Sequence, residues 1–290
     1  MLVGILGVAC PIVAVLTLPR PYDFRLSTER FRAFGPDLAN LWDGEALLRA
    51  VDGREVRIAA APGGVDVEPL DAETEPVVRK LLGAELDLGG FARFAAAADP
   101  VLARLASVLA GFRPPLAPDP FEALVGSITA QQVSLFAAFA IRSRLIERFG
   151  ARVGRVYAFP TRERLAAAAP EELTALGFSR RKAEYTLALA RTELDLEALA
   201  ALDDDEVRAR LVALPGIGEW TVDWFLARHL ARPRAWPAGD LGLQKAVTAF
   251  YGDGRVLRTA EVRDFGARFE PWQNLTAHYL LTGLRVSPPA

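Results

Sequence analysis

The stretch Leu214-Pro215-Gly216-Ile217-Gly218-Glu219-Trp220 lies between two segments with helical periodicity. Its proline helps to end the first helix, and Gly216 and Gly218 allow a tight turn into the second. Such a turn directs the N–H groups of Ile217, Gly218 and Glu219 outward, where they can bind a phosphate group. The pattern therefore predicts a helical hairpin with an anion-binding turn. An αα-corner without any ligand remains an alternative when this stretch is considered alone.

A carboxylate follows the hairpin at Pro237-Ala238-Gly239-Asp240. Asp240 immediately precedes a helix-compatible run over 241–251, and Asp is a preferred N-cap residue. The dipole of that helix stabilises the negative charge of a carboxylate at its N-terminus. An ionised carboxylate suits hydrolysis of an N-glycosidic bond, because the sugar develops oxocarbenium charge and water must be positioned. Since Asp240 follows Trp220 by only 20 residues, we predict a catalytic role in addition to capping.

The first part of the chain carries the β patterns. Apolar and β-branched runs predict strands over 12–18, 46–51, 55–60 and 64–70, and Asp52-Gly53 and Pro62-Gly63-Gly64 supply turns between the last three. Residues 23–34 predict a helix that covers one face of the resulting antiparallel sheet. We therefore expect an α+β domain over 12–90, and we interpret residues 1–11 as a tail or an over-long start.

From Phe91 onward the pattern is helical, and we expect 91–290 to be all-helical. The overall fold class is therefore α+β, with a small antiparallel-sheet domain followed by a mainly helical body. Short breakers separate the expected helices, which cover 101–110, 120–130, 133–149, 161–168, 170–176, 180–191, 203–213, 219–231, 241–251 and 269–285.

Composition excludes several classes of protein. The net charge of -2 gives no strong field toward nucleic acid, so binding to it has to rest on a local surface. Cys10 is the only cysteine, which excludes an intramolecular disulfide and a Cys-ligated zinc or iron–sulfur cluster. Residues 1–19 carry no charged side chain, but they lack a basic n-region and are interrupted by Pro11. We therefore expect neither a signal peptide nor a membrane segment, and a cytoplasmic location.

Several blocks occur in a fixed order that resembles AlkA-type 3-methyladenine DNA glycosylases of the helix-hairpin-helix superfamily. The likeness extends over about residues 12–285, and the ordered set is far more specific than any single block. The blocks are 121–125, 128–134, 176–183, 214–220 and 237–245, with Pro21-Tyr22-Asp23 after the first strand.

The resemblance implies an enzyme of base excision repair that hydrolyses the N-glycosidic bond of alkylated purines after flipping the base out of duplex DNA. It implies that Asp240 is catalytic and that Trp220 and Trp224 line the base pocket. Relatives that also cut the strand carry a Lys at the position of Trp220 for a Schiff base, so we expect a monofunctional enzyme. Gln132 stands where relatives insert an apolar wedge into the duplex.

The resemblance also implies partners and ions. The partner is double-stranded DNA that contains alkylated bases, bound to the hairpin at 216–219, with no membrane and no obligate protein partner, and we expect a monomer. No redox or nucleotide cofactor is implied. Relatives hold a monovalent cation, Na⁺ or K⁺, on hairpin carbonyls, which here belong to Val212, Leu214 and Ile217. Leu281 and Thr282 occupy positions where relatives carry pocket aromatics.

Some alternatives stay open. A glycosylase for 8-oxoguanine or a deaminated base would keep the hairpin and Asp240, and a non-catalytic DNA-binding module would need the hairpin alone. The run 180–182 (Arg-Arg-Lys) suits either phosphate contacts or the solvated first turn of a helix. His229 and His278 have no companion ligands at metal spacing, so we expect packing or surface roles for both.

Overall fold

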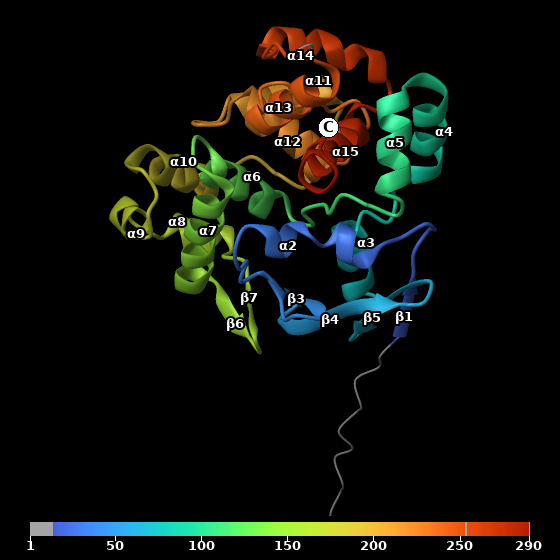
Figure 1. Cartoon of the computed structure of the whole chain (residues 1–290). Coiled ribbons are helices and arrows are strands. Elements are labelled where there is room, and N and C mark those ends of the chain that lie inside the picture. The colour runs from blue at the N-terminus through green and yellow to red at the C-terminus, as the bar shows by residue number, and fades with distance from the viewer. Residues whose placement is uncertain (1–13, 253, 290) are drawn as a thin grey trace, which may run out of the picture.

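The structure is a computed structural model that describes residues 14–252 and 254–289. The predicted tail at 1–11, Cys10 and the first two residues of the predicted strand over 12–18 lie outside the described residues. Figure 1 shows a small sheet on one side of the molecule and a larger body of helices on the other. No helix in the described part of the chain is long and apolar enough to cross a membrane.

The first five strands form one antiparallel sheet with the order β1-β5-β4-β3-β2. The turn between β3 and β4 has positive φ angles at both Asp52 and Gly53, which is the backbone twist that a two-residue hairpin requires. The strands are β1 (Ala14–Thr17), β2 (Asn40–Trp42), β3 (Ala46–Val51), β4 (Arg54–Ala61) and β5 (Gly64–Glu68). The predicted α+β domain with a meander is therefore confirmed.

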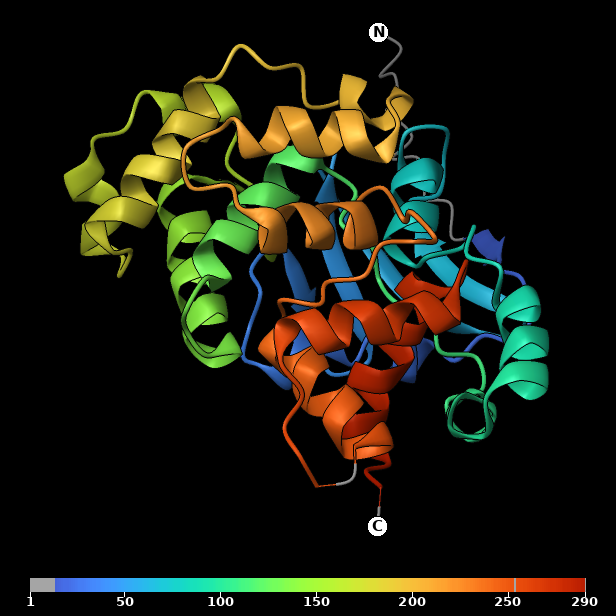
Figure 2. The same cartoon turned by 90° about the horizontal axis from the view of Figure 1, so that it is seen from above.

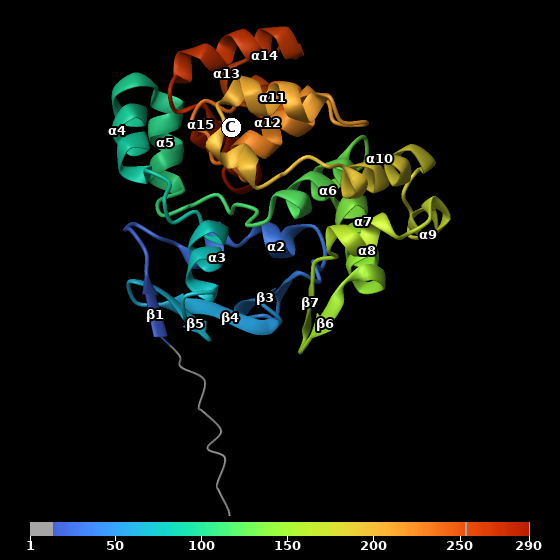
Figure 3. The same ribbon diagram turned by 180° about the vertical axis from the view of Figure 1, so that it is seen from behind.

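Three helices cover one face of this sheet, between the sheet and the helical body (Figures 1 and 3). They are α1 (Phe24–Ser27), α2 (Arg30–Ala33) and α3 (Thr74–Leu81). Phe24 and Phe31 pack with Val56 and Ile58 in the core beneath them. The single helix predicted over 23–34 is two short helices instead, and α3 was not predicted.

The body consists of helices with two separate apolar cores. One core lies among α6–α12, and the other among α4, α5 and α13–α15. The helices are α4 (Leu88–Ala98), α5 (Pro100–Val108), α6 (Pro120–Ala130), α7 (Leu135–Phe149), α8 (Arg162–Ala166), α9 (Pro170–Ala175), α10 (Arg180–Arg191), α11 (Asp204–Val212), α12 (Glu219–Arg228), α13 (Leu241–Tyr251), α14 (Thr259–Gly266) and α15 (Gln273–Val286), with 3₁₀ turns at Ala198–Ala201 and Ala267–Phe269.

The two cores give the body two lobes. Seen from above in Figure 2, α4 and α5 lie at the opposite end of the molecule from α8–α10. Helices α4 and α5 precede α6 in sequence, yet they pack with the carboxyl-terminal helices, because Phe91 and Leu105 share a core with Tyr279 and Leu280. The domain boundary predicted near residue 90 falls inside α4.

The prediction that 91–290 is all-helical is wrong at one place. Strands β6 (Ala151–Val153) and β7 (Val156–Ala158) form a hairpin against the face of the sheet opposite α3. Val156 packs there with Ala46 and Leu48, and Arg155 pairs with Glu55. Strands of three residues give no periodicity, so contact with the distant sheet decides their conformation.

Candidate active site

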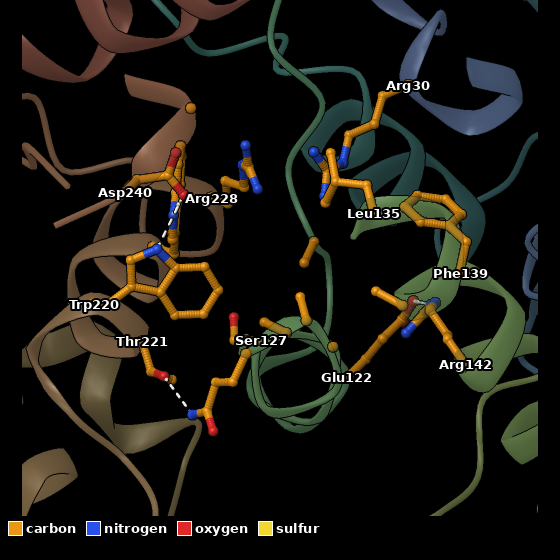
Figure 4. Close-up of a pocket in the computed structure, with 18 of the residues that line it drawn as sticks. Arg30, Glu122, Ser127, Leu135, Phe139, Arg142, Trp220, Thr221, Arg228 and Asp240 are labelled. Carbon is orange, nitrogen blue, oxygen red and sulfur yellow. Dashed lines mark hydrogen bonds and ion pairs between the residues drawn. The ribbon is translucent and has the colours of Figure 1, made fainter. Parts of the chain in front are cut away.

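Asp240 is the N-cap of α13, as its position before a helix-compatible run predicts. Its Oδ1 accepts a hydrogen bond from the N–H of Leu243 at 3.0 Å. Its Oδ2 accepts two more, from the indole Nε1 of Trp220 and of Trp224, both at 3.0 Å. Figure 4 shows the carboxylate beside the indole of Trp220 at the wall of a cleft. Three donors therefore hold this carboxylate in one orientation.

Helix α12 brings both indoles to the carboxylate. Trp220 and Trp224 are one helical turn apart, so they lie on the same face of the helix. The loop that returns to Asp240 closes tightly, because the Asp240 N–H donates to the carbonyl of Pro237 at 2.8 Å. The structure thus brings together the three residues that the sequence predicted for catalysis and the base pocket.

The two indoles differ in what they offer a ligand. Trp220 is half-buried and lines the cleft. Trp224 is only 3% exposed, and the guanidinium of Arg228 lies 3.5 Å from the centre of its ring. One face of Trp224 is therefore covered by Arg228. The rings of Trp224 and His278 also pack against each other in a T-shaped arrangement.

The hairpin at 214–220 joins α11 to α12, and its two glycines have different roles. Gly216 has a φ of 78°, and a Cβ there would lie 2.1 Å from the ring of Tyr185. Gly218 is the N-cap of α12 with an extended φ of -106°, and a Cβ there would meet nothing within 4 Å. The turn itself requires Gly216 but not Gly218. At Gly218 the absent side chain leaves the backbone open to an approaching group.

The N–H groups at the tip are only partly free. The Ile217 N–H donates to the carbonyl of Leu214 at 3.2 Å, so the prediction that it points outward to a ligand is wrong. The N–H groups of Gly218 and Glu219 donate no hydrogen bond to another described residue. Of the three predicted amides, these two lie at the start of helix α12 and are available to an anion.

The three carbonyls predicted to hold a cation belong to the same short segment. The Leu214 carbonyl accepts from Ile217, whereas those of Val212 and Ile217 accept no hydrogen bond from another described residue. Carbonyl oxygens carry two lone pairs, so all three are chemically able to coordinate a monovalent cation.

The loop after α6 contacts the hairpin through Gln131. Its Nε2 donates to the Gly216 carbonyl at 2.9 Å and to the Thr221 hydroxyl at 3.2 Å. The next residue, Gln132, is exposed with a φ of 54°, so the predicted wedge stands on a left-handed turn. The apolar side chains of Val133 and Phe136 are exposed beside it, at 40% and 64%.

The cleft has a volume of about 1410 Å³ and lies between the sheet domain and the helical body. Asp240, Trp220 and the hairpin line one side of it, and residues of α2 and α7 line the other (Figure 4). Several cationic residues of the cleft were not predicted as site residues, among them Arg30 on α2 and Arg228 on α12. Arg228 continues the i, i+4 stripe of Trp220 and Trp224, so the sequence did carry a pattern that could have revealed it.

Other predicted positions have structural contacts. Leu281 lines the cleft, and Thr282 is buried beside it. The His229 ring contacts the Ala117 carbonyl, and burial, followed by the nearby charge of Lys80, lowers the pKa of His229 to about 4. His278 is buried, with no hydrogen-bond partner for its Nε2 within the described residues.

The basic run at 180–182 is divided between surface and core contacts. Arg180 is exposed and pairs with Glu184, whereas Lys182 donates from its Nζ to the Thr129 carbonyl at 2.9 Å near the end of α6. Arg181 is exposed at the start of α10. Lys182 therefore supports the end of α6, close to the Gln131 contact.

Comparison with known proteins identifies one family. Residues 125–266 match the family model described as HhH-GPD superfamily base excision DNA repair protein. A DNA-3-methyladenine glycosylase of Bacillus subtilis is 31% identical over 193 residues, which is 64% of this chain and 64% of that protein. The matching part of the chain thus spans slightly less than two thirds of that relative.

Solved structures agree in fold. The 3-methyladenine DNA-glycosylase of Archaeoglobus fulgidus superposes with a TM-score of 0.84 at 25% identity, over 95% of this chain and 99% of that one. An 8-oxoguanine glycosylase/lyase of Clostridium acetobutylicum in complex with double-stranded DNA has a TM-score of 0.79 at 18% identity, over 94% of this chain and 97% of that one. At that identity the second likeness concerns the fold alone.

Proposed function

We propose that the chain, whose residues 125–266 match the HhH-GPD superfamily of base excision DNA repair proteins, is a monofunctional DNA glycosylase that hydrolyses the N-glycosidic bond of alkylated purines in duplex DNA. The observation that carries the proposal is the carboxylate of Asp240, which receives two indole N–H groups and a helix N-terminal N–H at the wall of a large cleft. The likeness to 3-methyladenine glycosylases supports alkylated purines as the substrate class.

In the proposed mechanism the damaged nucleotide leaves the base stack and its base enters the cleft beside Trp220. The free N–H groups of Gly218 and Glu219 bind a backbone phosphate, and Gln132 occupies the space left in the duplex. As the glycosidic bond breaks, the negative charge of Asp240 stabilises the oxocarbenium character of the sugar and positions water for attack. Because an alkylated purine leaves as a neutral base, the reaction needs little help from a general acid.

A constellation of this kind favours an enzyme over a DNA-binding module. A module would need the hairpin but would gain nothing from a carboxylate held by three donors inside a cleft. Trp220 cannot form a Schiff base, which supports hydrolysis without strand cleavage. The 8-oxoguanine glycosylase/lyase resembles the chain in fold alone.

The proposal includes a few further expectations. It needs no redox or nucleotide cofactor, because water and a carboxylate suffice for the hydrolysis. A monovalent cation, Na⁺ or K⁺, held by the carbonyls of Val212, Leu214 and Ile217 would strengthen the contact between hairpin and phosphate. The enzyme would act as a monomer on double-stranded DNA in the cytoplasm, where it reaches the chromosome.

The decisive experiment measures base release from methylated duplex DNA by the purified protein and by Asp240→Asn. We expect the variant to lose base release and to keep its affinity for lesion-containing DNA within a few fold, because the amide retains size but lacks negative charge. Asp203→Asn is the matched control, since Asp203 caps α11 through the Glu206 N–H without any indole contact. It should release bases as the wild type does.

Thermal unfolding of both variants separates chemistry from folding. An Asn at 240 turns its amino group toward either the indoles or the helix N-terminus, so at least one donor loses its acceptor, at a cost of about 1–3 kcal/mol. A folded Asp240→Asn protein with normal turnover would show that Asp240 is only an N-cap and would overturn the proposal.

A further inference from the structure

Two guanidinium groups point into the inner part of the cleft from opposite walls (Figure 4). Arg228 extends from α12 of the body, and Arg30 extends from α2 of the sheet domain. Arg228 lies on the ring of Trp224, and the Cζ of Arg30 lies 5.8 Å from the ring centre of Phe139. Neither guanidinium donates a hydrogen bond to any described residue. Both therefore have all their N–H donors available to a ligand.

Both guanidinium groups are desolvated and have no hydrogen-bond acceptor among the described residues. Burial is the main cause that lowers the pKa of Arg228 well below its usual range, and the charge of Arg30 lowers it further, while Asp240 opposes both. Burial also lowers the pKa of Arg30, to about 10, with Arg285 as the next cause. A desolvated cation without an acceptor is costly, so a ligand oxygen placed between these groups would relieve that cost.

The other polar groups nearby do not fill this place. Arg285 already donates to Glu29 Oε2 at 3.0 Å and to the Leu281 carbonyl at 3.2 Å. The buried ring of His278 lies behind Arg228, where a cavity of about 30 Å³ holds no more than about one water. A ligand that enters the cleft could supply the acceptor.

Arg228 and Asp240 both contact the indole of Trp224. The Nε1 of Trp224 contacts Asp240, and the face of the same indole carries Arg228. The carboxylate thus lies at one edge of the indole, and the guanidinium lies over its face. In a purine, a bicyclic ring separates the glycosidic nitrogen from the substituent at position 6. A base whose glycosidic bond lies at Asp240 can therefore place that substituent beside the guanidinium groups, which lie in the same part of the cleft.

We propose that Arg228 and Arg30 bind the 6-carbonyl oxygen of the extruded purine, so that the enzyme prefers 6-oxopurines to 6-aminopurines. An arginine has only donors, so it binds the O6 acceptor of a guanine-type base and meets the amino group of an adenine-type base donor to donor. The inference rests on the proposed function and specifies which alkylated purines the enzyme prefers. It also makes Arg30 a contribution of the sheet domain to the base pocket.

The test compares 7-methylguanine with 3-methyladenine, because both are cationic in the nucleoside and differ at position 6. Single-turnover release of each base from the same duplex is measured for the wild type, Arg228→Met and Arg30→Met. We expect Arg228→Met to lower the ratio of 7-methylguanine to 3-methyladenine release about tenfold or more, through loss of 7-methylguanine release. Arg30→Met should also lower this ratio, although Arg30 lies on α2 and Arg228 on α12.

Arg104→Met is the matched control, since Arg104 also lies over an aromatic ring, that of Phe250, but outside the cleft. It should leave the ratio unchanged. An equal loss of both bases in Arg228→Met and Arg30→Met would show that the arginines serve a phosphate or the fold, and an unchanged ratio would show no contact with position 6. Either result overturns the inference while leaving the glycosylase activity of the wild type in place. Absence of any base release by the wild type would instead overturn the proposed function.

Discussion

Substitutions at the two hairpin glycines test whether the hairpin binds DNA, because the fold requires a glycine at position 216 but not at position 218. In Gly218→Ala the new methyl group projects into open space, and the φ of -106° suits any residue. In Gly216→Ala the methyl group meets the ring of Tyr185 at 2.1 Å on a backbone with a φ of 78°. The first change should act on a ligand and the second on folding.

The expected magnitudes differ accordingly. Left-handed backbone costs an alanine roughly 1–2 kcal/mol, and the overlap with Tyr185 adds roughly 1–3 kcal/mol. A loss of about 2 kcal/mol or more lowers the melting temperature of Gly216→Ala by at least about 3 °C for a chain of this size. Gly218→Ala loses roughly 0.5 kcal/mol, because alanine is a poorer N-cap than glycine.

The assay combines thermal unfolding with binding to undamaged and to lesion-containing duplexes at one salt concentration. If a phosphate approaches the N–H groups of Gly218 and Glu219, the methyl group of Gly218→Ala displaces it. Loss of a charged hydrogen bond of about 1.5–3 kcal/mol weakens binding roughly tenfold to a hundredfold. Both duplexes should be affected alike, because backbone contacts carry no sequence information.

Gly239→Ala is the matched control for the added methyl group. Gly239 likewise has nothing within 4 Å of a Cβ, but it lies next to Asp240 and not on the hairpin. Its binding to undamaged duplex should equal that of the wild type. Wild-type affinity of Gly218→Ala for both duplexes, or a loss confined to the lesion, would refute a phosphate contact at the hairpin.

Two further predictions concern the pocket and the domain contact. Trp220→Ala should slow release of methylated purines, because it loses stacking on the base that is worth about 1–3 kcal/mol. Borohydride should trap no covalent complex of the wild-type protein with damaged DNA. A trapped adduct, for instance through Lys245 at the cleft, would contradict hydrolysis without strand cleavage. Glu122→Gln should lower the free energy of unfolding by about 3–5 kcal/mol at neutral pH, because Arg49 loses its carboxylate partner and Arg142 keeps only Asp37. Burial raises the pKa of Glu122, but the two arginines outweigh burial and lower that pKa to about 2. Urea unfolding should therefore show that the stabilisation is complete above about pH 4.5 and is lost toward pH 2. A difference in stability between the wild type and Glu122→Gln that does not change with pH would contradict this.

Local patterns in the sequence were sufficient for those parts of the site that lie close together along the chain. Asp240 was predicted as an N-cap from the residue type before a helical run, and it accepts the expected hydrogen bond from the N–H of Leu243. The spacing of Trp220 and Trp224 placed them on one helix face, and both contact Asp240.

Contacts between distant segments were not predictable in this way. Arg30 reaches the cleft only because the sheet domain packs against the body, and no local pattern encodes that contact. The hairpin at 151–158 depends in the same way on a distant sheet. Even at the predicted turn, the hydrogen bond of the Ile217 N–H depends on the conformation of Leu214, which the glycine pattern leaves open.

The contact between the two domains explains how Arg30 is held in place. Arg49 of β3 donates to Glu122 of α6 at 2.6 Å, and Arg142 of α7 pairs with both Glu122 and Asp37, the latter at 3.1 Å. Buried ion clusters of this kind add little stability over apolar packing, yet they require one geometry, because any displacement leaves a buried charge unpaired. Asp37 follows α2 closely in the chain, so the same cluster fixes the helix that carries Arg30. The sheet domain is therefore a wall of the cleft rather than an appendage, and a variant that disrupts the cluster should alter the choice of base as well as stability.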